Sequence, residues 1–339
     1  RWWLAVGVAA GLGLLSKYSV LFLGAGIALW LVSTKETRRW FADARLWIGG
    51  AIAVLLFAPV VLWNAEHQWA SFAKQFGRAA VEEWRPEKLG ELIGVQLLLI
   101  GLPMVPFVAL GLRRAFARRD AVAWLPILTG VPFVAYLLFH SLHAGVEGNW
   151  PAPLYPSFAW LAAIGAGDLA TLGATWGARL RRLRGFVAPV GFGLVGLVYL
   201  HVLVPVVVLP ANRDPTAQMR GWADFDRDLA ALGDRVGAHV FGGVNYTLAA
   251  KLAVGLGAEV VAPFDERERW VDLPVLDPRR VCGPILYVDR AGRDPSAALA
   301  AHWRSVTSLG TLARRAGGKV VEEHPVWRLA DPVDCDPAG

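Results

Sequence analysis

The chain has 339 residues, of which 55% are hydrophobic and only 18% charged, and its mean hydropathy is +0.42. This composition excludes an ordinary soluble globular protein and predicts a membrane protein, in which the 16 tryptophans fit the lipid–water interfaces. The net charge of +6 does not indicate a nucleic-acid-binding protein, because the basic residues lie in short segments between apolar runs rather than on one face.

The first apolar segment, residues 2–32, is interrupted only by Ser16, Lys17, Tyr18 and Ser19. A charge at the centre of a bilayer costs about 2.5–3.5 kcal/mol on insertion scales. We therefore expect two short helices with Lys17 at the turn between them, rather than one long helix that buries the lysine.

Further along the chain, five apolar runs have about the length that a helix needs to cross a bilayer, roughly 20 residues. They cover residues 46–63, 89–112, 121–140, 151–170 and 186–209. Together with the first segment they predict that the fold is mainly α, with a polytopic transmembrane helix bundle over residues 1–210.

The connections between these runs alternate in charge. Residues 64–88 and 140–150 are longer and more acidic, whereas the other connections are basic. The basic residues are Lys35, Arg38, Arg39, Arg45, Arg113, Arg114, Arg118, Arg119, Arg179, Arg181, Arg182 and Arg184. By the positive-inside rule these lie in the cytoplasm. Lys17, the acidic connections and everything after residue 210 are then expected on the outer side of the membrane.

After Pro210 the sequence becomes mixed and polar. Helix-like stretches (218–232, 245–256 and 295–302) alternate with strand-like ones (238–241, 258–262, 285–288 and 319–328). This alternation predicts a small extracytoplasmic α/β domain over residues 211–339. Both cysteines, Cys282 and Cys335, lie in it, and an oxidising compartment would permit a disulfide between them. The sequence leaves open whether they pair.

Two motifs have ordinary structural interpretations. Gly7 and Gly11 are spaced like a small-residue face on which another helix packs. Asp224, Asp226 and Asp228 contain an Asp-x-Asp pair such as nucleotide-sugar enzymes use for a metal, but positions two apart on a helix do not share a face. We interpret them as a solvated helix start, and we predict no metal site.

The connection after the run 46–63, residues 64–88, is rich in hydrogen-bonding side chains. Asn64, His67, Gln75 and Arg78 lie in it, and its aromatic residues recur at helical spacing. An amphipathic helix in the membrane interface is expected here, with a cationic rim suited to an anionic lipid headgroup. A surface helix with solvated charges is the alternative.

Residues 147–156, EGNWPAPLYP, form a polar corner stiffened by prolines. Glu147 and Asn149 could bind the hydroxyls of a sugar or pair with Lys17, and the indole of Trp150 offers a flat face on which sugars stack. Lys17, beside Tyr18, needs a carboxylate or a phosphate as partner. The alternatives are a purely conformational corner and a structural or snorkelling lysine.

Several stretches resemble bacterial members of the protein-mannosyltransferase and aminoarabinose-transferase family. They are GLGLLSKY (11–18), PVVLWNAEHQWASF (59–72), Gln75 with Arg78, GNWPAP (148–153) and DPTAQMRGW (214–222). The resemblance covers most of residues 1–225. It implies a glycosyltransferase of the C-type fold that moves a sugar from a polyprenyl-phosphate donor to a lipid, glycan or protein acceptor. The substrate-binding residues would be Lys17, Tyr18, Asn64, His67, Gln75, Arg78, Glu147, Asn149 and Trp150.

In this family the catalytic aspartate lies in the first large external loop, which would precede Arg1. We therefore expect the chain to be the later part of a longer protein, and we assign no catalytic residue. No cofactor is required by this chemistry, and a divalent cation is left open. Two other functions are open as well: a transporter, and a membrane-anchored envelope assembly protein without transferase activity.

Overall fold

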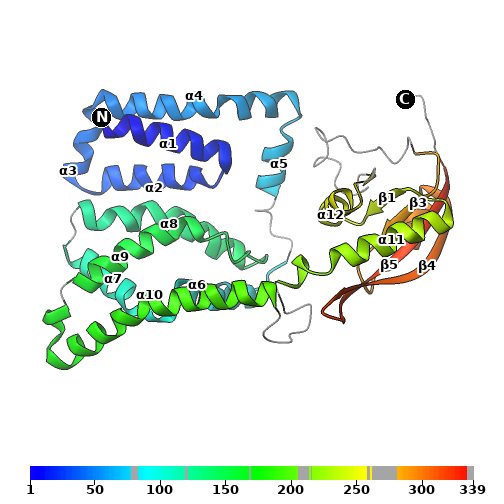
Figure 1. Cartoon of the computed structure of the whole chain (residues 1–339). Coiled ribbons are helices and arrows are strands. Elements are labelled where there is room, and N and C mark those ends of the chain that lie inside the picture. Colours follow the sequence, from blue (N-terminus) through cyan, green and yellow to red (C-terminus); the bar gives the residue numbers. More distant parts are fainter. Residues whose placement is uncertain are drawn as a thin grey trace. The chain divides into compact units, whose positions relative to one another are not determined.

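The computed structural model describes residues 1–77, 83–118, 121–167, 169–204, 214, 216–257, 260–261 and 281–333 (Figure 1). The chain divides into two compact units, Arg1–Val195 and Gly196–Gly339. We describe each unit by itself.

Unit 1 begins with two short helices, α1 (Trp2–Ser16) and α2 (Val20–Ser33), which confirms the predicted break at Lys17. A short helix α3 (Lys35–Arg38) and a 3-10 turn (Arg39–Ala42) lead into α4 (Ala44–Glu66). The small-residue face of α1 packs on α4, as predicted. A Cβ at Gly7 would collide with the carbonyl of Gly49, and one at Gly11 would lie 2.7 Å from the Cβ of Leu56.

The run predicted as one span over residues 89–112 is broken. It forms α6 (Glu87–Ile100), a 3-10 turn (Leu102–Met104) and α7 (Val105–Arg118), and the helices on either side of the break are bent by 85°. The prediction failed because hydropathy does not report backbone geometry. Gly101 has φ +85°, a conformation that glycine adopts without strain, and Pro103 follows in the turn.

The later helices of unit 1 also differ from the predicted bounds. Helix α8 (Ala121–Ser141) matches its predicted span, but α9 (Tyr155–Gly167) has 13 residues, so at 1.5 Å per residue it is only about 20 Å long. Helix α10 (Ala174–Leu203) starts well before residue 186. The arginines of segment 179–184 therefore lie inside a helix and not in a connection.

Among the described residues, three helices, α4, α8 and α10, are long and apolar enough to cross a membrane. The number rises to five if each of two bent helix pairs counts as one span. These helices and the composition indicate a membrane protein.

Unit 1 has two distinguishable ends. At the arginine end (residues 30–45, 113–118, 121–124, 164–167 and 169–184) the indole N–H of Trp30 donates to Ala121 O (2.6 Å), and Arg114 Nη1 donates to Ile164 O (2.8 Å). The corner end (residues 16–22, 64–77, 83–87 and 139–155) holds the break after α1, helix α5 (Ala70–Gly77) and the corner itself. Within unit 1, Lys17, helix α5 and the corner, which were predicted to share one side of the membrane, lie at this corner end (Figure 1).

Unit 2 is built on a five-stranded sheet with the order β2-β1-β3-β5-β4. Strands β2 (Val260–Val261), β1 (Val240–Gly243) and β3 (Ile285–Val288) are parallel, whereas β5 (Lys319–Pro332) and β4 (Trp303–Ala316) form an antiparallel hairpin. The helices are α11 (Trp222–Val236), α12 (Tyr246–Leu256) and α13 (Ser296–Ala300). The α/β character is as predicted, but strand β4 was missed.

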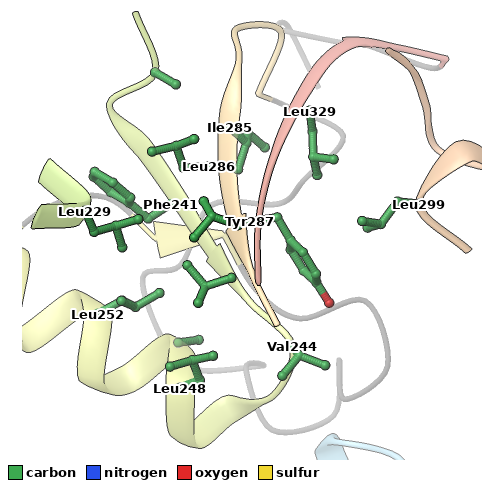
Figure 2. Packing of buried hydrophobic residues seen from close by; sticks show 14 of the residues in the cluster. Leu229, Phe241, Val244, Leu248, Leu252, Ile285, Leu286, Tyr287, Leu299 and Leu329 are labelled. Atoms are coloured by element: carbon green, nitrogen blue, oxygen red, sulfur yellow. The ribbon is translucent and has the colours of Figure 1, made fainter. Parts of the chain in front are cut away.

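The core of unit 2 lies around β3, all four residues of which are buried. Figure 2 shows Leu248 and Leu252 of α12 on one side of the strands and Leu299 of α13 on the other. A strand covered on both faces reads as a continuous apolar run, which is why Ile285–Val288 was recognisable from sequence. Cys282, just before β3, is disulfide-bonded, and Cys335 lies outside the described residues.

Candidate functional site

Lys17 and Tyr18 occupy the break between α1 and α2. The side chain of Lys17 is exposed, and within the described part of the chain no acidic residue pairs with it. Tyr18 is half-buried. Its ring stacks on Phe72 of α5 at 5.2 Å and meets Phe57 of α4 edge-on at 5.9 Å. The aromatic neighbours therefore hold the break in place and leave the ammonium group accessible.

Asn64 is fully buried and holds the turn between α4 and α5. Its Nδ2 donates to Val60 O (2.9 Å), and its Oδ1 accepts the backbone N–H of Ser71 (3.1 Å). The turn needs this support, because Gln68 and Trp69 have φ of 55° and 57°. Since no surface of Asn64 is accessible, we assign it a positioning role rather than contact with a substrate.

The other residues of this segment are more open. His67 is half-buried and stacks on Trp63 with 4.1 Å between ring centroids, while its Nδ1 lies 2.7 Å from Trp63 O. Gln75 is exposed on α5, and Arg78 lies outside the described residues. The helix predicted in this segment is therefore present as α5, with aromatic contacts to α4 and to the break after α1. Its position in the membrane interface stays a prediction.

The corner 147–154 is a series of tight turns. The backbone N–H of Trp150 donates to Glu147 O (2.9 Å), and that of Ala152 donates to Asn149 O (3.2 Å). Glu147 and Asn149 point their exposed side chains outward, whereas Trp150 is half-buried against the cluster of Leu92, Phe133, Leu137 and Leu154. The corner therefore combines accessible polar groups with an anchored indole.

Gln96 of α6 ties this corner to the bundle, and sequence reasoning missed it. Its Nε2 donates to Gly148 O (3.1 Å), and its Oε1 accepts the hydroxyl of Tyr155 (2.9 Å). A glutamine in the middle of an apolar helix was the available signal, because an amide in a membrane helix needs a partner.

A row of aromatic rings connects the corner with the break after α1. Centroid distances are 4.9 Å for Phe22–Tyr136, 5.6 Å for Tyr136–His140 and 5.4 Å for His140–Trp150. Tyr18 precedes Phe22 by four positions at the start of α2. The structure thus brings the segments of Tyr18 and Trp150 to one end of unit 1. Tyr136 and His140 were not predicted.

The segment 214–222 lies within unit 2 and has a structural role there. Asp214 accepts the hydroxyl (2.6 Å) and the backbone N–H (2.9 Å) of Thr216, and pairs with Arg220 (3.0 Å) and His201 (3.3 Å). Burial alone would raise the pKa of Asp214. The hydrogen bonds from Thr216 and His201 and the charge of Arg220 outweigh it and lower that pKa to about 2.

Arg314 of β4 joins the same segment to the sheet. Its Nη1 donates to Ala217 O (2.6 Å) and to Arg220 O, and its Nη2 donates to Glu322 (2.7 Å). The guanidinium also lies over Trp222 at 4.6 Å. This buried network anchors the segment that follows the last span.

The three aspartates at the start of α11 differ in their exposure to solvent. Asp224 and Asp228 are exposed, as predicted, but Asp226 is buried, and burial raises its pKa. Among the described residues, no group of three or more His, Cys, Asp or Glu gathers that could hold a metal ion.

A comparison with protein families matches residues 1–63 to the dolichyl-phosphate-mannose-protein mannosyltransferase family. Neither the curated proteins nor the solved structures contain a match to the chain. The matched segment holds α1, α2 and nearly all of α4, and it includes Lys17 and Tyr18. Together with the apolar helices, it supports a relationship with the protein-mannosyltransferase superfamily, a group of membrane glycosyltransferases.

Proposed function

We propose that the protein takes part in transferring a sugar from a polyprenyl-phosphate donor to a lipid, glycan or protein acceptor outside a bacterial inner membrane. The observation that carries this proposal is the gathering of Lys17, Tyr18, α5 and the corner at one end of a bundle of apolar helices. The family match to residues 1–63 supports the reaction class.

The chemistry of the transfer fits the groups at the corner end. A polyprenyl phosphate leaves readily when a cation meets its charge, and the acceptor needs a carboxylate to take its proton. The exposed ammonium of Lys17 would meet the phosphate at the membrane surface while the isoprenoid tail stays in lipid. Glu147 and Asn149 would bind sugar hydroxyls, and Trp150 would stack on the ring. We assign the proton-accepting role to none of these residues.

Two features support an extracytoplasmic corner end and C-terminal unit. The arginine end carries most of the arginines of unit 1, and the positive-inside rule favours the cytoplasm for it. Cys282 is disulfide-bonded, and disulfides persist in oxidising compartments outside the cytosol.

The test is donor turnover by the intact protein in proteoliposomes. A radiolabelled polyprenyl-phosphate hexose or pentose is supplied, and the release of free polyprenyl phosphate is measured. Lys17→Ala should lower this release about 10- to 100-fold, because a hydrogen bond to a charged group contributes roughly 1.5–3 kcal/mol. Lys35→Ala, which removes an exposed lysine at the arginine end, is the matched control. Equal release by Lys17→Ala and wild type would refute the site, and no release from any lipid-linked sugar would refute the reaction.

A further inference from the structure

A cavity of about 820 Å³ lies in unit 1 among α1, α2, α8 and α9. Its volume is in the range of roughly 300–1,000 Å³ that small-molecule sites occupy. The walls are apolar along most of its length, from Gly13 and Val20 beside the break to Trp40 at the arginine end. A long apolar cavity between membrane helices suits a hydrocarbon chain.

Indole rings surround one end of this cavity. Trp3 packs against Trp30 at 6.5 Å and edge-on against Trp40 at 5.8 Å, and all three line the cavity. The N–H of Trp30 is held by Ala121 O at 2.6 Å. Tryptophans take such positions at the level of lipid headgroups, where one part of the ring is dry and the other wet. The indoles at this end of the cavity are therefore of the kind that matches the headgroup level of a bilayer.

The charged residues of the lining all lie at this same end. They are Arg1, Asp43 and Arg45, so cations exceed anions. Asp43 is occupied with capping α4, because its Oδ1 accepts the backbone N–H of Arg45 (2.9 Å). The guanidinium Nε of Arg45 forms a long ion pair with that oxygen (3.9 Å), beyond hydrogen-bond distance, and the side chain is 61% exposed to other partners. Arg45 can therefore bind an anion at the mouth of the cavity.

We propose that the cavity binds one acyl chain of an anionic phospholipid from the leaflet at the arginine end, with the lipid phosphate against Arg45. The apolar walls match the chain, the indoles match the headgroup region and the arginine matches the charge. The sugar donor is a poorer match, because Lys17 does not line the cavity and the lining cations lie at the arginine end. This lipid site is independent of the proposed transfer reaction.

The experiment measures lipid retained by the intact protein. Purified protein is stripped of lipid, incubated with vesicles of phosphatidylglycerol and phosphatidylcholine, re-isolated in detergent and analysed by mass spectrometry of the extracted lipids. Wild type should retain phosphatidylglycerol in preference to phosphatidylcholine. Arg45→Ala should reduce that preference about fivefold, since an arginine near an anionic lipid surface contributes roughly 1 kcal/mol. Arg45→Lys should keep most of it.

A second variant tests the cavity itself. Ala10→Phe places a ring in the lining and should abolish retention, whereas Ala5→Phe, on the same helix outside the lining, should not. Both variants must elute and melt like wild type, and if Ala10→Phe does not, Ala9→Leu replaces it. Equal retention by all variants would overturn the proposal and indicate lipid bound to the outer surface only. Retention of a polyprenyl phosphate in place of phosphatidylglycerol would also overturn it, in favour of the donor tail.

Discussion

Tyr18, at the break between α1 and α2, stacks on Phe72 of α5 with an interplanar angle of 18°. The two residues are far apart in the sequence, and each belongs to a segment that was singled out for its polar neighbours. Their contact joins the turn that carries Lys17 to helix α5, so that both segments lie at one end of unit 1.

This contact predicts an energetic coupling between the two rings. Stacked aromatic pairs contribute about 0.5–1.5 kcal/mol beyond the area that they bury. A double-mutant cycle with Tyr18→Ala and Phe72→Ala should return a coupling of that size in detergent unfolding experiments. Tyr18→Phe should preserve it, since the stack needs only the ring. Strictly additive effects would contradict the stacked geometry.

Asn64 provides a test of positioning against substrate contact. Asn64→Ala leaves the backbone N–H of Ser71 without its side-chain partner and removes the bond across the turn that contains Gln68 and Trp69. We expect a loss of about 1–3 kcal/mol in unfolding free energy, the usual cost of unpairing buried polar groups. The exposed Gln75→Ala should change stability by less than about 0.5 kcal/mol. A stable Asn64→Ala protein with weakened donor affinity would instead make Asn64 a ligand-binding residue.

The side chain of Gln96 is expected to hold the corner in position and to contribute little to the stability of the apolar helix. Gln96→Leu keeps the apolar helix but removes both hydrogen bonds, to Gly148 O and from the Tyr155 hydroxyl. If the corner binds substrate, turnover should fall about 10-fold, which corresponds to a positional cost of roughly 1.4 kcal/mol. Tyr155→Phe removes only one of these bonds and should have the smaller effect. Unchanged turnover in Gln96→Leu would show that the corner holds its shape without this tie.

Asp214 predicts how the stability of unit 2 depends on pH. Its pKa of about 2 in the folded protein lies below the usual 3.8, so the ionised form stabilises the fold. This contribution is complete above about pH 5 and is lost as the pH falls through 3.8 towards 2.

Asp214→Asn should therefore flatten the acid limb of the stability curve and lower stability at neutral pH. The matched control is Asp224→Asn, which alters an exposed aspartate of the same unit that pairs with Arg227 at the surface. Thermal unfolding between pH 2 and pH 7 is the measurement, and identical acid limbs for Asp214→Asn and wild type would contradict the prediction.

The elements that could be predicted are those whose cause is local. Helices α1, α2, α4 and α8 follow from apolar windows and from the cost of burying Lys17, both of which are properties of a few consecutive residues. That Gly7 and Gly11 form a packing face could be predicted for the same reason, because two small residues one turn apart leave room for a backbone. That the partner is α4 came from the structure.

The elements that the sequence analysis did not predict depend on long-range pairing or on the conformation of a single residue. Strand β4 carries Gly310 and several polar residues, and its extended form is stabilised by pairing with β5 rather than by its own pattern. The bend after α6 depends on a single backbone conformation at Gly101. Neither can be read from hydropathy.

For the candidate site, the sequence by itself determined which segments are polar, that they share one end of the helices, and that Lys17 lies at a turn. Only the tertiary structure decided which of these residues meet. It buried Asn64 as a support, joined Tyr18 to Phe72, and placed Gln96 and the His140 ring beside the corner. The physical reason is range: the backbone hydrogen bonds of a helix form within four residues, whereas these contacts depend on which helix faces pack together.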